Sequence, residues 1–249
     1  MNKQKKSVNR KALPKFFGII LIAAFFGGIA GGLFSFMSDT NLPDTITSAL
    51  SSTLTIISPY CIWISTLLFS GIGFIFYLQA RNSFQCWDGE EEILIAHTEK
   101  KLSLMLLMTI INMLLDFFFF GLSFVLIKGD STASALAIIG FLLSIAAIII
   151  LQQKAIDLTR KINPEKQGSV YDTKFQKKWI ASCDENEQRK MGQAAFKAFN
   201  VVNYTCIALW LFLMLLSLAI PVGILPIILV MFIWGISQIT YCMESMRLE

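Results

Sequence analysis

The sequence predicts an all-α, polytopic integral membrane protein with six transmembrane helices paired as three hairpins. Three observations lead to this fold class: an apolar composition, six long apolar runs, and a one-sided distribution of basic residues. Of the 249 residues, 55% are hydrophobic and 15% are charged, and the mean hydropathy is +0.64. Soluble domains carry about 25% charged residues. A water-soluble fold is therefore not expected.

The six apolar runs are long enough to cross a bilayer as helices. A spanning helix needs about 20 residues, because each residue rises about 1.5 Å through a hydrocarbon core about 30 Å thick. The windows that qualify are 16–38, 54–78, 102–127, 132–151, 203–220 and 224–242. The first is too long for a typical signal peptide and no cleavage motif follows it, so we expect a retained span. The last two form a tight hairpin, because Pro221 and Gly223 interrupt the helix between them.

The basic residues fix the expected orientation. The chain has 21 Lys and Arg residues, and all except Lys128 lie before the first span, after the sixth, or in the two connectors at 79–101 and 152–202. Basic loops face the cytoplasm. Both termini and both connectors are therefore expected to be cytoplasmic, and the whole chain forms one membrane domain with membrane lipid as its surroundings.

The connector at 152–202 contains a short segment that combines aromatic and basic residues. Phe175 and Trp179 are four residues apart and share one helix face, while Lys174, Lys177 and Lys178 accompany them. Such a helix is typical of the membrane surface, with its rings in the headgroup layer. A docking face for a cytosolic partner is the alternative. The spacing of Ser182 and Glu185 then predicts the start of the next helix, as a capping box.

The third span contains the residue with the largest free-energy cost of insertion into a membrane. Asp116 is its one acidic residue, and a charge at that depth costs about 2.5 to 3.5 kcal/mol. Thr109, Asn112, Asp116 and Ser123 share one helix face, which predicts an inward polar stripe. One interpretation is a proton- or cation-responsive site in a transport path. The other is a neutral carboxyl that holds helices together through polar contacts.

The first span contains four glycines in two overlapping GxxxG patterns, at Gly27, Gly28, Gly31 and Gly32. Absent side chains let another helix approach closely. The pattern predicts helix packing, either within the chain or across a homo-oligomer interface.

Catalytic and metal-binding patterns are missing from the sequence. His97 is the one histidine, so a two-histidine metal site is ruled out, and there is no P-loop and no GxSxG motif. Five widely spaced cysteines are typical of reduced thiols. We therefore expect no enzyme activity, no cofactor and no bound metal, and the modest net charge gives no reason to expect nucleic acid as a partner.

Two stretches resemble a known family. They are residues 171–185, reading YDTKFQKKWIASCDE, and residues 239–248, reading ITYCMESMRL. The chain resembles a family of bacterial membrane proteins catalogued as domain of unknown function 3169 (DUF3169), over nearly its whole length. The resemblance implies a bacterial plasma membrane and carries neither an activity nor functional residues.

Two functions fit these observations. The first is a non-enzymatic accessory component of a membrane transport, export or peptide-resistance system, working with an ABC-type transporter or another membrane protein. A basic cytoplasmic surface without an energy-coupling domain favours it. The alternative is a self-sufficient small-solute or ion transporter that uses the intramembrane acidic site at Asp116.

Overall fold

The computed structural model describes residues 18, 21, 22, 25, 27–29, 31, 32, 42–87, 92–218 and 220–247. Within these residues the chain is helical and contains no strand, and five helices are long and apolar enough to cross a membrane. The all-α class is thereby confirmed. The first predicted span, 16–38, lies mostly outside the described residues, so the count of six spans and the first hairpin stay predictions.

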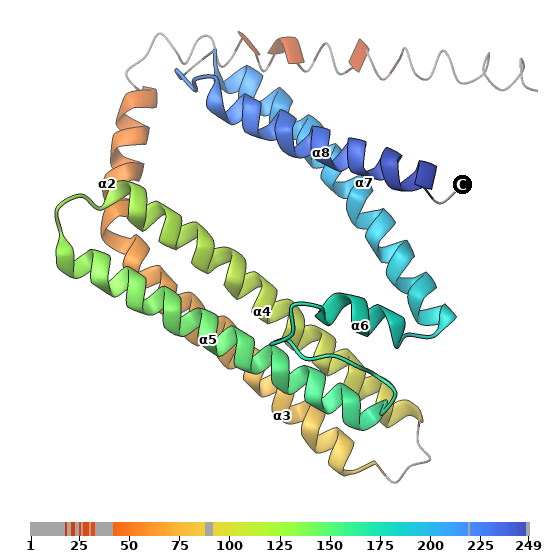
Figure 1. Cartoon of the computed structure of the whole chain (residues 1–249). Helices are drawn as coiled ribbons and strands as arrows, with labels where there is room; N and C mark the ends of the chain where they lie inside the picture. The colour runs from red at the N-terminus through yellow and green to blue at the C-terminus, as the bar shows by residue number, and fades with distance from the viewer. Residues whose placement is uncertain are drawn as a thin grey trace, which may run out of the picture. The chain divides into compact units, whose positions relative to one another are not determined.

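The described helices follow one another along the chain, and the longest described link runs from α5 to α6 (Figure 1). One continuous apolar helix covers Ser48–Gln85. It consists of most of α2, then a π-helical turn (η1), and then α3. The elements are α2 (Leu42–Ser65), η1 (Thr66–Ser70), α3 (Gly71–Gln85), α4 (Glu92–Leu126), α5 (Ser131–Ile162), α6 (Phe175–Ala181), α7 (Glu185–Leu216) and α8 (Leu225–Arg247).

Several helices continue well beyond the apolar windows. Most of the window at 102–127 lies in a helix that begins at Glu92, the window at 132–151 lies in one that ends at Ile162, and most of the window at 203–220 lies in one that begins at Glu185. The flanking residues are mostly helix formers such as Glu, Lys, Gln and Ala, with no proline, so the helix continues where hydropathy falls. In its described part the connector at 79–101 therefore consists mainly of the end of α3 and the beginning of α4, which runs directly into the third apolar window.

The described chain divides into two compact units, and residues 49–190 form the first. Here α4 and α5 run beside the α2–α3 helix, and we call this group the three-span bundle (Figure 1). Gly129, at φ +84°, makes the turn between α4 and α5. Asp130 then caps α5, because its carboxylate accepts the N–H groups of Thr132 and Ala133 at 3.0 and 3.1 Å.

The second unit comprises residues 1–48 and 191–249. Gln238 of α8 donates to Asn203 of α7 at 2.7 Å, and the rings of Phe199 and Tyr241 stack with centroids 4.7 Å apart. The helix break between α7 and α8 includes Gly223 at φ +72°, a conformation that glycine adopts without strain.

The four glycines of the GxxxG patterns in the first predicted span have helical backbone. A Cβ at Gly31 would lie 3.8 Å from the side chain of Leu218, whereas Gly27, Gly28 and Gly32 have nothing within 4 Å. The Gly31 contact is ordinary packing within this unit. A homo-oligomer face at the other three glycines stays a prediction.

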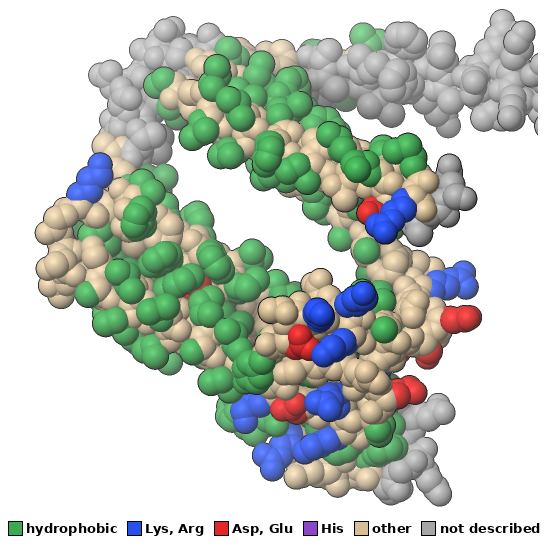
Figure 2. Space-filling model, viewed as in Figure 1, with side chains coloured by type: hydrophobic (Ala, Val, Ile, Leu, Met, Phe, Trp, Pro, Cys, Tyr) green, Lys and Arg blue, Asp and Glu red, His purple; other side chains and the backbone are tan. Residues whose placement is uncertain are grey.

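The surface of the helices is apolar over most of its length. Figure 2 shows hydrophobic side chains covering the three-span bundle, while Lys, Arg, Asp and Glu gather around α6 and the adjacent helix ends. An apolar belt with charge at its end is what a lipid-exposed bundle requires, because lipid tails cannot solvate charge.

One glycine in the bundle is fixed by a close contact. Trp63 donates its indole N–H to the Leu136 carbonyl at 3.2 Å, and a Cβ at Gly140 would lie 2.7 Å from that indole nitrogen. We expect Gly140→Ala to cost about 1 to 3 kcal/mol through overpacking. Gly121→Ala is the matched control, because nothing lies within 4 Å of that position. Thermal unfolding of purified protein measures both, and equal midpoints would contradict this close contact.

Candidate functional site

The four polar residues of the predicted stripe on α4 are all buried in the three-span bundle. The exposed fraction is zero for Thr109, Asn112 and Asp116 and 3% for Ser123. The α-helical repeat places them on one face, and that face meets the α2–α3 helix and α5. The structure therefore places the stripe on the inward side.

Asp116 is held by serines from two other helices. Its Oδ1 accepts a hydrogen bond from Ser65 at the end of α2 at 3.0 Å, and its Oδ2 accepts one from Ser144 of α5. Both serines are buried as well. Donors to a carboxyl offset part of the cost of removing it from water. The buried acid is thus accommodated by polar partners that the neighbouring helices supply.

Asn112 lies one turn from Asp116 on α4 and shares a partner with it. Its side-chain amide donates to Ser144 at 3.1 Å and to Ser70 of η1 at 3.2 Å. Its Oδ1 is buried and accepts no hydrogen bond in the described structure. Ser144 therefore joins the two α4 residues, and the asparagine carbonyl is left without a donor.

Two further pairs extend this polar core along the bundle. Ser123 donates to Ser58 of α2 at 2.9 Å toward one end, and Gln152 of α5 donates to Thr109 at 3.3 Å toward the other. We name the whole set the polar ladder. Its members are Ser58, Ser65, Ser70, Thr109, Asn112, Asp116, Ser123, Ser144 and Gln152.

The π-helical turn explains how Ser65 and Ser70 reach the same site. Residues five apart on an α-helix point about 140° apart around the axis. A π-helix bonds residue i to i+5, which brings positions five apart onto nearly one face. Ser65 immediately precedes η1 and Ser70 ends it, so the turn directs one serine to Asp116 and the other to Asn112.

Sequence reasoning missed the ladder's partners outside α4. Ser58 and Ser65 are seven residues apart and Ser144 and Gln152 are eight apart, so each pair lies on one helix face. Those spacings, inside apolar windows, were a usable signal for inward polar faces. Ser70 had no such signal, because its position depends on the π-helical turn.

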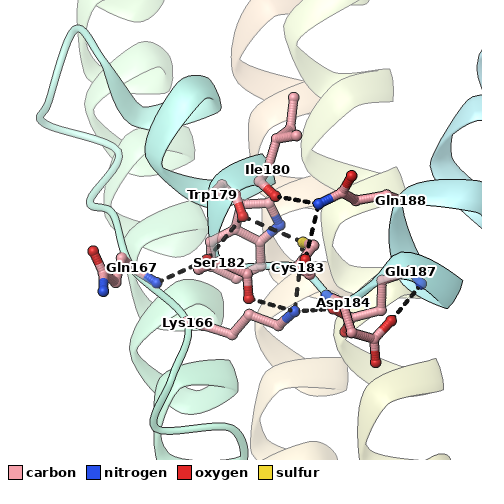
Figure 3. Close-up of polar contacts among 9 residues, drawn as sticks. All are labelled: Lys166, Gln167, Trp179, Ile180, Ser182, Cys183, Asp184, Glu187 and Gln188. Atoms are coloured by element: carbon pink, nitrogen blue, oxygen red, sulfur yellow. Dashed lines mark hydrogen bonds and ion pairs between the residues drawn. The ribbon is translucent and has the colours of Figure 1, made fainter.

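The second polar cluster lies in the chain between α5 and α7, residues 163–184, which we call the long connector. Lys166 is its centre, and its side chain is only 4% exposed (Figure 3). The ammonium forms an ion pair with Glu187 and lies 3.4 Å from the Cys183 sulfur and 3.5 Å from the Ser182 carbonyl. The Trp179 ring centroid is 6.0 Å away. The lysine thereby fastens the loop after α5 to the turn before α7.

The ion pair shifts the pKa values of Lys166 and Glu187 in the directions that favour their charged forms. Burial alone would lower the pKa of Lys166, but its contacts with Glu187 and Cys183 outweigh burial and raise the pKa above 10.5. The hydrogen bond from Lys166 holds the pKa of Glu187 below 4.5, against a smaller opposing effect of burial. Both groups are therefore charged at neutral pH.

The start of α7 differs from the predicted capping box by two residues. The Asp184 N–H donates to Glu187 at 3.0 Å, and the Glu187 N–H donates to the Asp184 carboxylate at 2.7 Å. Ser182 instead accepts the Gln167 N–H at 3.1 Å and donates to the Trp179 carbonyl. The expected pair of Ser182 and Glu185 is therefore wrong, because Ser182 belongs to the end of α6.

The aromatic residues of α6 pack against the long connector itself. The rings of Phe175 and Trp179 lie 5.5 Å apart, both are half-buried, and Phe175 packs on Gly168, where a Cβ would lie 2.8 Å from the ring. The lysines at 174, 177 and 178 are exposed, and Lys178 pairs with Asp172 at 2.5 Å. Contact of this helix with lipid or with a partner stays a prediction.

Five helices that are long and apolar enough to cross a membrane, with a carboxyl buried in a polar ladder, indicate the class of α-helical membrane proteins. The chain belongs to the DUF3169 family, described as a protein of unknown function, whose profile matches residues 10–245. This match confirms the resemblance inferred from the sequence. No curated protein and no solved structure matches the chain.

Proposed function

We propose that the protein is a non-enzymatic component of a transport, export or peptide-resistance system in the bacterial plasma membrane, with both termini in the cytoplasm. The observation that carries this proposal is the surface of α6. Its aromatic residues are turned into the long connector while Lys174 and Lys177 stay exposed. A cationic surface of this kind fits an acidic surface on a partner protein, such as an ABC-type transporter.

The long connector is suited to hold such a surface in place. Gln153 of α5 accepts hydrogen bonds from Ser169 and from the Val170 N–H at 3.0 and 2.9 Å, and Lys166 ties the same loop to Glu187. Binding costs less when the binding surface is already ordered. The proposal therefore assigns the connector to partner binding and the bundle to the membrane.

Copurification of the full chain from native membranes in mild detergent tests this proposal. We expect one membrane protein to accompany the wild type, and a Lys174→Glu, Lys177→Glu double variant to lose it. Lys197→Glu, an equally exposed change on α7, is the control and should retain the partner. A partner that survives the double substitution, or repeated preparations that contain none, would contradict the proposal.

A second function, self-sufficient transport of a small solute or ion, is favoured by one observation in the ladder. The Asn112 carbonyl has no donor although it lies beside Asp116 in a fully buried cluster. Ionisable groups at this depth commonly mark substrate or ion pathways. Purified protein in liposomes should then move a solute under a proton or sodium gradient, and Asp116→Asn should abolish the flux. A broad substrate panel without any flux would exclude this function.

A further inference from the structure

We infer that Asp116, Asn112, Ser65 and Ser144 form a binding site for one monovalent alkali cation, with Na⁺ as the probe ion. The inference deepens the second candidate function by naming its ion. It rests on the geometry of the polar ladder, and it stands whether or not a partner binds the long connector.

One buried acceptor in this cluster has no hydrogen-bond donor. A buried carbonyl without a donor costs about 1 to 3 kcal/mol, and native proteins seldom leave one unpaired. Asn112 Oδ1 is such a group, on a side chain with no exposed area, one helical turn from a carboxyl. A positive ion between the two would pair with both.

The cluster has few side-chain protons to donate, and each already has an acceptor. Ser65 and Ser144 have one hydroxyl proton each; the Ser144 proton is directed to Asp116, and the Ser65 proton is within hydrogen-bond distance of both Asp116 and the Ile62 carbonyl. The two amide protons of Asn112 are directed to Ser70 and Ser144. No side-chain proton among these groups is left for Asn112 Oδ1. The cluster has an excess of oxygen acceptors, which is the condition that a bound cation relieves.

The ligand atoms and the charge of the cluster determine which type of ion it would bind. All the available ligands are carboxylate, amide or hydroxyl oxygens, which suit hard cations. Asp116 is the one carboxylate of the polar ladder, and the windows 54–78, 102–127 and 132–151 contain no Lys or Arg. A single positive charge therefore makes the site neutral, whereas a divalent ion would leave a net charge in a low-dielectric bundle.

The helix beside the site is irregular, because the π-helical turn η1 follows Ser65. Ser65 and Thr66 both direct their hydroxyls to the Ile62 carbonyl, at 3.0 and 2.7 Å, immediately before and within η1. Irregular helix turns at membrane depth supply backbone oxygens to ions in other membrane proteins. If Ser65 turns from Ile62 toward an ion, its oxygen becomes a ligand while Thr66 still satisfies the carbonyl.

The ladder also has an approach from one end of the bundle. Ser123 lines a cavity of about 200 Å³ between α4 and α5, together with Phe120 and Ser134. Ser123 is bonded to Ser58, so the cavity reaches the outer pair of the ladder, and Asp116 lies two helical turns further along α4.

Thermal unfolding of the purified full chain tests the site, with NaCl compared against choline chloride at equal ionic strength and constant pH. At 100 times the dissociation constant we expect the wild-type midpoint to rise by about 5 to 11 °C in Na⁺. Asp116→Asn and Asn112→Leu should remove this difference. Ser103→Ala, at an exposed position on the same helix, is the control and should retain it.

Equilibrium binding of ²²Na⁺ to the wild type is the second measurement, and it is independent of how the variants fold. We expect about one ion per chain, displaced by Li⁺ or K⁺ and not by choline. No binding together with no Na⁺-dependent midpoint would overturn the inference, as would an unchanged Na⁺ effect in Asn112→Leu. A midpoint that follows pH alone would assign the position to a proton. Binding without flux in liposomes would support the site and exclude the second candidate function.

Discussion

Ser144→Ala is expected to lower the midpoint of thermal unfolding by roughly 4 to 8 °C, which corresponds to about 2 kcal/mol for a chain of this size. Ser144 donates to Asp116 and accepts from Asn112, and its exposed fraction is zero. Alanine therefore leaves a carboxyl oxygen and an amide proton without this partner at once. Water cannot replace the hydroxyl inside an apolar bundle without opening it.

Ser134→Ala is the matched control for this prediction, because it makes the same change on the same helix. The Ser134 hydroxyl donates only to the Asp130 carbonyl at 2.8 Å, at a half-buried position in the first turn of α5. We expect its midpoint to stay within about 2 °C of the wild type. Equal shifts for the two variants would show that Ser144 does not connect Asp116 to Asn112.

The inward stripe on α4 could be predicted because it depends on local spacing alone. Four polar residues recur on one face of an apolar helix, and burying that face inside the bundle is the arrangement that costs least. The long apolar helices were predictable for the same reason, since hydropathy over about 20 residues decides membrane insertion. Helix ends were less predictable, because Glu, Lys and Gln continue a helix beyond the apolar part.

The partners of the stripe depend on how separate helices meet, which spacing within one helix does not specify. Ser70 reaches Asn112 because a π-helical turn replaces a regular turn. The residues of that turn, TLLFS at 66–70, contain no pattern that predicts it. The burial of Lys166 depends likewise on a turn some 20 residues later in the chain. The sequence analysis assigned no role to Lys166, because lysines are almost never buried unless they are paired and spacing does not show the partner.

The largest expected effect outside the bundle comes from Glu187→Ala in the long connector. This substitution leaves the Lys166 ammonium buried without its counterion and removes the capping bond to the Asp184 N–H. Fully buried pairs cost about 3 to 5 kcal/mol to break, and we expect about 2 kcal/mol here, since Glu187 is 36% exposed. Amide hydrogen exchange in residues 163–184 should accelerate about 30-fold.

Two further variants separate the ion pair from the helix cap. Glu185→Ala removes an exposed acid from the same first turn of α7 and should leave connector exchange nearly unchanged. Lys166→Met keeps the buried stem and leaves Glu187 able to hydrate and to cap Asp184, so its effect should be smaller than that of Glu187→Ala. An effect of Glu185→Ala as large as that of Glu187→Ala would show that helix charge, rather than the ion pair, stabilises the connector.

The pH dependence of connector exchange follows from the two shifted titrations. Glu187 has a pKa held below 4.5 by Lys166, so its contribution is complete above pH 4.5 and is lost as the pH falls through the folded-state pKa. Lys166 has a pKa raised above 10.5, so its contribution is complete below pH 10.5 and is lost only as the pH rises through that higher value. Protection, corrected for intrinsic exchange, should therefore be flat between these limits and fall in acid. Glu187→Ala should remove the part of the acid loss that this carboxylate causes, because no carboxylate then remains to be protonated beside Lys166.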